Sequence, residues 1–126
     1  MNLFLYLPQD NGAGETLVAL SEKVAVDGPV IPIRSFRQLA SRLGQPLNDR
    51  DVVILYLPHR RHLEEMLTIA SLLERVRLIV ILPDPKPETI ALGHKLRPRF
   101  LTTVDQHFQD VAAVLRKMGE AVRPAA

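Results

Sequence analysis

Three apolar runs dominate the hydrophobic pattern of this chain, and each of them ends at a proline. The runs are Phe4 to Leu7 before Pro8, Ile54 to Leu57 before Pro58, and Ile79 to Leu82 before Pro83. Continuous runs of this length are typical of strands that are buried on both faces, as in a parallel sheet covered by helices. Because proline has no N–H to donate to a strand ladder, each proline predicts the carboxyl end of its strand.

Segments with helical spacing alternate with these runs and with two shorter strand patterns. The expected strands are residues 2–7, 30–33, 51–57, 78–82 and 100–103. The expected helices are residues 13–25, 35–43, 60–74, 87–93 and 105–118. Five strand–helix units in succession predict an α/β fold. The expected arrangement is three-layered and doubly wound, (βα)5, around a five-stranded parallel sheet of order 2-1-3-4-5.

Local signals predict where two of the helices begin and end. Ser35 and Gln38 have the spacing of a capping box, which predicts the start of the second helix. Asp105 is the expected N-cap of the last helix, and Gly119 is its expected end. With 126 residues in the chain, we expect one domain at residues 1–119 and a loose tail at residues 120–126.

Composition narrows the classes of partner and chemistry. The chain has 16 Lys and Arg against 14 Asp and Glu, a net charge of +2 that is too balanced for a polycation binding nucleic acid. Cysteine is absent, which excludes thiol chemistry and disulfides. No apolar run approaches ~20 residues, and the start lacks the basic leader of a signal peptide. We therefore expect a cytoplasmic protein with neither a nucleic-acid nor a membrane partner.

The carboxyl end of the sheet is where open α/β folds place their ligands. A basic segment opens the third predicted helix there, and helix N-termini with arginines attract phosphates and carboxylates. The residues of this candidate anion-binding rim are Asn11, His59, Arg60, Arg61, His62, Thr102 and Thr103. The alternative is a solvated first turn in which Arg60 and Arg61 pair with Glu64 and Glu65.

Other chemistries lack the residues that they require. The turn Asn11-Gly-Ala-Gly14 is followed by Leu17 where a dinucleotide-binding fingerprint has its third glycine. The histidines lack the third ligand that a zinc site needs. An enzyme built on Asp10, Asp84 and a histidine would need a spacing of base and nucleophile that is not visible. We therefore expect no catalytic residue, no metal and no cofactor.

Several segments follow the order found in a known family. Asp51-Val-Val-Ile-Leu-Tyr56 is followed by Ile79-Val-Ile-Leu82, Ala91-Leu-Gly93 and Phe100-Leu-Thr-Thr-Val-Asp105. In this succession the chain resembles the receiver domain of response regulators, the chemotaxis-type domain with a flavodoxin-like fold. The resemblance covers nearly the whole chain, and it implies the (βα)5 fold and a role in signalling.

The residues that receivers use for phosphorylation are replaced in this chain. Tyr56 stands at the phospho-acceptor position, and Leu7 and Pro8 stand where receivers carry an acidic pair. Thr103 takes the place of the receiver lysine. Transfer to aspartate needs a carboxylate nucleophile and a magnesium ion, and a phenol with an ordinary pKa of about 10 is a poor substitute. The resemblance therefore implies a degenerate pseudo-receiver that is not phosphorylated on aspartate.

We expect a non-catalytic regulatory module that acts by protein–protein contact. The alternative is a sensor of a small phosphate- or carboxylate-containing ligand at the rim. Receivers commonly dimerise or dock partners through their fourth helix, fifth strand and fifth helix, which implies a weak homodimer there. The expected interface residues are Lys95, Arg97, Phe100, Asp105, Asp110 and Arg116. Mixed charge suits a two-fold contact, and an ordinary soluble surface requires it equally.

Overall fold

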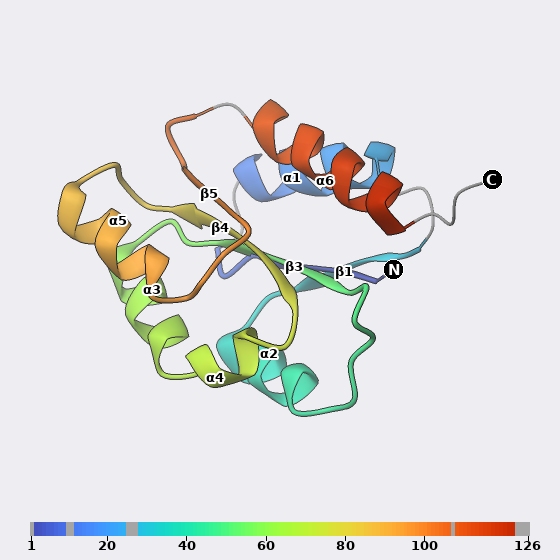
Figure 1. The fold of residues 1–126 in the computed structure, drawn as a ribbon. Coiled ribbons are helices and arrows are strands. Elements are labelled where there is room, and N and C mark those ends of the chain that lie inside the picture. The colour runs from blue at the N-terminus through green and yellow to red at the C-terminus, as the bar shows by residue number, and fades with distance from the viewer. Residues whose placement is uncertain (1, 10–11, 25–27, 107, 123–126) are drawn as a thin grey trace.

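Five parallel strands form one sheet in the computed structural model, which describes residues 2–9, 12–24, 28–106 and 108–122 (Figure 1). The strands are β1 (Leu3–Tyr6), β2 (Val30–Ile33), β3 (Val52–Tyr56), β4 (Arg77–Leu82) and β5 (Phe100–Thr103). Their order is β2-β1-β3-β4-β5, and every neighbouring pair is parallel. The predicted α/β class, sheet order and strand positions are confirmed, with strand ends that agree within one residue.

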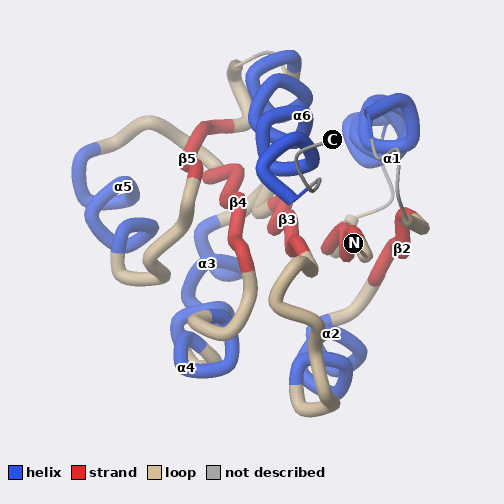
Figure 2. The backbone as a smooth tube through the Cα atoms, turned by 45° about the vertical axis from the view of Figure 1, so that its right-hand side comes forward, coloured by secondary structure: helices blue, strands red, loops and turns tan. Residues whose placement is uncertain are grey.

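Helices cover both faces of this sheet. They are α1 (Gly12–Val24), α2 (Phe36–Leu43), α3 (Arg60–Leu67), α4 (Ala70–Leu73), α5 (Pro87–His94) and α6 (Gln109–Val122). α1 and α6 lie side by side on one face, whereas α2, α3, α4 and α5 lie on the other (Figure 2). No helix within the described ranges is long and apolar enough to cross a bilayer.

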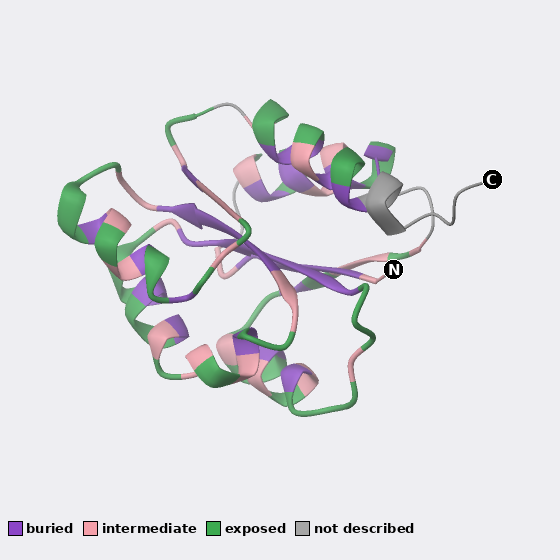
Figure 3. Cartoon of the chain, in the orientation of Figure 1, coloured by how far each residue is buried: buried purple, intermediate pink, exposed green. Residues whose placement is uncertain are grey.

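The central strands contribute to two separate cores, which explains why their apolar runs are unbroken. Val53 and Leu55 of β3 pack on the side of α2 and α3, and Val52 and Ile54 pack on the side of α1 and α6. All four side chains are fully buried, as are most residues of β1 and β4 (Figure 3). An alternating pattern would leave one of these two cores without apolar side chains.

The start of α2 follows its sequence signal. The Gln38 N–H donates to Ser35 Oγ at 3.1 Å, which makes Ser35 the N-cap. The return bond of the capping box comes from the Arg34 N–H to Gln38 Oε1 at 3.3 Å, one residue ahead of the N-cap. The predicted boundary is therefore confirmed, with the second bond displaced by one position.

The prediction of a single helix at residues 60–74 is wrong, because the helix is interrupted between α3 and α4. Thr68 Oγ1 donates to the Glu65 carbonyl at 2.6 Å. Ile69 then leaves the helical region with φ −118° and ψ 24°. A threonine that bonds its own preceding turn competes with the helix ladder, and this bond lies at the break.

The expected ends of the last helix are also wrong. α6 begins at Gln109, where the Ala112 N–H donates to the Phe108 carbonyl at 3.1 Å, so Phe108 and not Asp105 takes the N-cap position. α6 continues through Gly119 to Val122, because one glycine inside a helix costs only about 1 kcal/mol. Residues 123–126 lie outside the described part, and the division into a domain of residues 1–119 and a tail of residues 120–126 stays a prediction.

Candidate functional site

The carboxyl end of the sheet is apolar at the point where the strand order reverses, between β1 and β3. Leu7 and Leu57 follow these strands and are fully buried. The Leu7 N–H donates to the Ile33 carbonyl at 2.8 Å, and the Leu57 N–H donates to the Ile81 carbonyl at 3.0 Å. These bonds extend the ladder by one residue on each strand. The usual ligand-binding crevice of an open α/β sheet therefore has leucines at its base.

Tyr56, the residue at the expected phospho-acceptor position, is a core side chain. It is 5% exposed and packs on the face of the sheet covered by α1 and α6. Its ring meets the ring of Phe108 edge-on, with centroids 6.3 Å apart and an interplanar angle of 86°. An edge-to-face pair of this kind is a packing contact that helps to hold the start of α6 on the sheet.

A second phenol, which sequence reasoning did not single out, lies on the opposite face. Tyr6 ends β1 and is 1% exposed, among residues that pack against α2 and α3. Burial first, and the negative charge of Glu65 second, raise the pKa of Tyr6 to about 12. The Tyr6 phenol is therefore protonated at neutral pH and is no nucleophile.

His62 works as a capping residue at the start of α3. The N-cap is His59, and its N–H donates to His62 Nδ1 at 3.2 Å. The two rings lie 5.6 Å apart, and His62 is 6% exposed. Burial lowers the pKa of His62, and the positive charge of Arg61 lowers it further. His62 is thus held neutral, with the Nδ1 lone pair already used, and it is not free to bind an anion.

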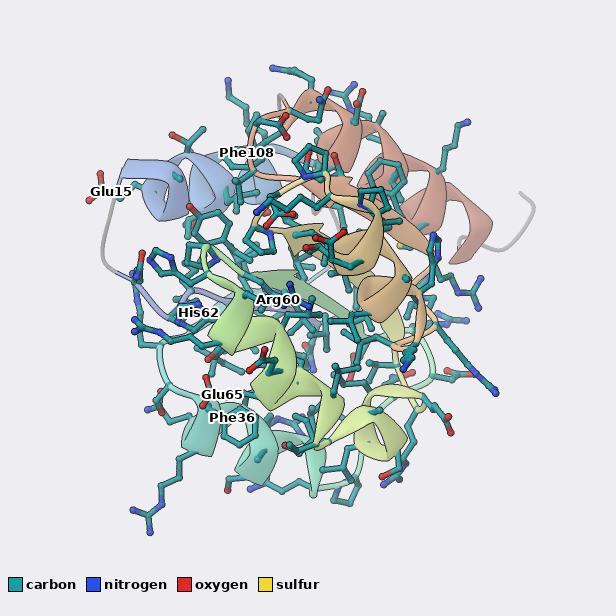
Figure 4. All side chains as sticks on the ribbon, turned by 90° about the vertical axis from the view of Figure 1, so that its left-hand side faces the viewer. Glu15, Phe36, Arg60, His62, Glu65 and Phe108 are labelled. Carbon is teal, nitrogen blue, oxygen red and sulfur yellow. The ribbon has the colours of Figure 1, made fainter. Side chains whose placement is uncertain are left out.

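The two arginines of the rim point to solvent. Arg60 Nε lies 3.7 Å from Glu64 Oε1, which is the pairing expected for a solvated first turn. Arg61 is exposed, and the described residues offer it no ion pair with Glu65 or any other carboxylate. Figure 4 shows Arg60 and His62 on the first turn of α3 and Glu65 one turn further along. Of these two arginines, only Arg61 has no ion pair within the described residues.

The two threonines of β5 contribute little to the rim. Thr102 and Thr103 are both buried. The Thr103 hydroxyl donates to Asp105 Oδ1, so the position of the receiver lysine is occupied by a locally satisfied hydroxyl. Asn11 lies outside the described residues. Of the described rim residues, His62, Thr102 and Thr103 are buried and Arg61 is exposed, and anion binding at this rim stays a prediction.

Asp84 is a rim carboxylate that the expected site did not include. It follows β4, and its Oδ1 accepts the Lys86 N–H at 3.0 Å. The neighbouring Thr89 hydroxyl and this N–H are the main causes that lower the pKa of Asp84, and the charges of Lys86 and Arg60 act in the same direction. The spacing Asp84-Pro-Lys86 is the available sequence signal, since an aspartate commonly accepts the N–H two residues later.

A magnesium or zinc site needs several such groups together. No group of three or more histidines or acidic residues could hold a metal ion within the residues that the structure describes. Within the described part of the chain, Asp84 therefore lacks the carboxylate neighbours that magnesium-dependent phosphoryl transfer requires.

The expected interface residues lie on the face formed by α5, β5 and α6, hereafter the β5 face. α5 and α6 are the fourth and fifth helices of the receiver pattern, because the extra helix α4 follows α3. Lys95, Arg97, Asp105, Asp110 and Arg116 are exposed, and Phe100 is half-buried. Further half-buried apolar side chains of this part of the chain are Leu92, Leu101, Val104 and Val114. The β5 face thus combines both signs of charge with incompletely covered apolar surface.

Comparison with known proteins supports the fold. The sequence matches no family model and no curated protein. Among solved structures, the chain is similar to a response regulator from Colwellia psychrerythraea, with a TM-score of 0.67 and 20% sequence identity. The similarity covers 95% of this chain and 97% of that one. The chain therefore has a receiver-like, flavodoxin-like fold over nearly its full length.

Proposed function

We propose that the chain is a receiver-like signalling module that acts by protein contact and is not phosphorylated on aspartate. The observation that carries this proposal is the apolar character of the switch point, the place between β1 and β3 where the strand order reverses. Leu7 and Leu57 are buried there, and Tyr56 belongs to the core. A receiver needs a carboxylate nucleophile and carboxylates for magnesium at that point. Because leucines and a buried tyrosine stand in place of these carboxylates, recognition of another protein is the function that the remaining surface supports.

The β5 face is the proposed contact surface, and it suits a weak two-fold homodimer. A two-fold axis lets Arg97 or Arg116 of one copy meet Asp105 or Asp110 of the other. Each exposed pair contributes only about 0–1 kcal/mol, so burial of the half-exposed apolar side chains must supply most of the affinity. This balance predicts association in the micromolar to millimolar range.

Sedimentation velocity at protein concentrations from about 10 µM to 1 mM detects dissociation constants in that range. These constants correspond to the association free energies of about 4–7 kcal/mol expected for such a contact. We expect the wild type to self-associate and the Arg97→Glu/Arg116→Glu variant to remain a monomer. The matched control is Arg34→Glu/Arg37→Glu, which reverses two exposed charges near α2, away from the β5 face. A dimer that survives the first pair of reversals, or a wild type that is monomeric throughout, would remove this interface.

The second candidate function is an anion sensor at the rim, favoured by the exposed and unpaired Arg61. A ligand at one hundred times its dissociation constant would stabilise the fold by about 2.7 kcal/mol. Thermal unfolding with phosphate and with citrate, for the wild type and Arg61→Gln, measures this directly. A concentration-dependent rise in Tm that Arg61→Gln abolishes would favour the sensor over the contact module.

A further inference from the structure

Three arginines lie at the amino end of the sheet, opposite the rim described above. Arg50 precedes β3, Arg77 is the first residue of β4, and Arg99 precedes β5. Because these strands are parallel neighbours, the chain enters all three from the same end (Figure 2). Arg77 Nη2 donates to the Arg50 carbonyl, and the Arg99 N–H donates to the Leu78 carbonyl at 2.7 Å. We call Arg50, Arg77 and Arg99 the amino-end arginine cluster.

Among the residues that the structure describes, no ion pair neutralises the positive charge of this cluster. In the described part of the chain the one ion pair joins Arg60 to Glu64, at the other end of the sheet. Asp51 lies near the cluster, but its two oxygens accept the N–H groups of Asn2 and Asn48, each at 3.0 Å. The carboxylate of Asp51 is thus engaged with backbone and does not reach a guanidinium.

The arginines also influence one another. The pKa of Arg77 is lowered by burial first and by the charge of Arg99 second, with Arg50 acting in the same direction. The charges of Asp49 and Asp51 act in the opposite direction. Burial, the largest cause, disfavours the charged form of the guanidinium, and a bound anion would favour that form.

The cluster retains unused hydrogen-bond donors. Arg77 Nη1 donates to the Met118 carbonyl at 3.3 Å, whereas its Nε is buried and has no acceptor. Arg50 and Arg99 are exposed, and their guanidinium groups donate to no acceptor within the described residues. The Arg77 guanidinium is fixed by two carbonyl acceptors, and the charges of Arg50 and Arg99 lie near it. Guanidinium groups gathered in this way suit planar anions such as carboxylates.

We propose that the amino-end arginine cluster binds an acidic segment of a partner protein through its side-chain carboxylates. Neighbouring strands are about 4.8 Å apart, so the entries to β3 and β5 are separated by roughly 10 Å. An extended peptide presents side chains on one side about every 7 Å, which lets two of its carboxylates reach Arg50 and Arg99. The inference rests on the proposed function as a contact module, but it uses the end of the sheet and not the β5 face.

The nearly balanced charge of the chain favours a protein partner over nucleic acid. Binding through phosphates draws its strength from many released counterions, and a net charge of +2 supplies few of them. A short acidic segment needs only the local excess of charge that the cluster provides.

Fluorescence anisotropy with a labelled octaglutamate peptide at low salt tests this inference on the full chain. We expect the wild type to bind, and Arg50→Gln/Arg99→Gln to bind at least about tenfold more weakly. The matched control, Arg34→Gln/Arg37→Gln, removes the same charge from two exposed arginines beside α2 and should change the affinity less than about twofold. No binding by the wild type, or equal weakening in both double variants, would overturn the inference.

Two further arms identify the partner class and separate the two proposals. A single-stranded oligonucleotide of equal charge that binds more tightly than the peptide would overturn the choice of an acidic protein. The Arg97→Glu/Arg116→Glu variant keeps all three cluster arginines, so it should lose self-association and keep peptide binding. Loss of peptide binding in that variant would assign the peptide to the β5 face and contradict the amino-end site.

Discussion

Protonation of His62 should weaken the fold, because its neutral ring caps α3. The pKa of this residue is lowered in the folded chain and is about 6.5 in the unfolded chain. The unfolded chain therefore binds the proton more readily. The contribution of His62 to stability is fully present above about pH 6.5 and is lost as the pH falls through the lower folded value.

The structure also sets the size of the effect of removing the cap. His62→Ala deletes the acceptor for the His59 N–H and leaves a space beside the buried residues of α3. Loss of a cap costs about 0.5–2 kcal/mol, and loss of the buried ring adds to this. His62→Gln is the matched control, because glutamine at this helix position accepts the same N–H and does not titrate.

Urea denaturation at pH 7.5 and at pH 5.5 tests both statements. At pH 7.5 we expect His62→Ala to lose about 1–3 kcal/mol and His62→Gln to stay within about 1 kcal/mol of the wild type. On acidification the wild type should lose more stability than His62→Gln, which shares every other titrating group. If both proteins lose the same free energy of unfolding on acidification, or if the wild type loses less than His62→Gln, the capping role of His62 is refuted.

Three other substitutions probe the fold. Gly93→Ala should lower the free energy of unfolding by about 1–3 kcal/mol in urea denaturation, because the added Cβ would lie 2.8 Å from Leu101 Cδ1. The control is Gly12→Ala, whose Cβ would meet nothing within 4 Å and should not destabilise the fold. Asp51→Ala should cost about 1–3 kcal/mol, because it leaves two backbone N–H groups without their acceptor, and an unchanged Tm would contradict this. Arg97→Gly should raise stability by about 0.5–1 kcal/mol in the same assay, because Arg97 has φ 54°, whereas no gain would mean that its backbone is unstrained.

The fold could be predicted from sequence because each of its decisive signals is local. Apolar runs that end at prolines mark the buried strands, and the Ser35–Gln38 spacing marks the start of α2. The break after Thr68 could not be predicted in the same way, because it accompanies one side-chain bond to the preceding turn. The sequence predicts Asp105 as a helix cap, but its carboxylate accepts a hydrogen bond from the Thr103 hydroxyl.

The candidate site was less predictable, because residue type does not reveal which atoms are already engaged. His62 looked like part of a basic rim, yet burial and the His59 N–H make it a neutral cap. The spacing of residues 59 and 62 is that of a capping box, but histidine is not its usual second member. Asp51 begins the segment that resembles the receiver pattern, but its bond to Asn2, 49 positions away, follows only from the fold.

The central claim is that the switch point of this receiver-like sheet does not support aspartyl phosphorylation. Intact-mass measurement after incubation with acetyl phosphate and magnesium tests it most directly, with a receiver that retains its aspartate as the positive control. We predict an unchanged mass for this chain and a gain of one phosphoryl group for the control. A phosphoryl group on this chain that maps to an aspartate, such as the rim residue Asp84, would contradict the account.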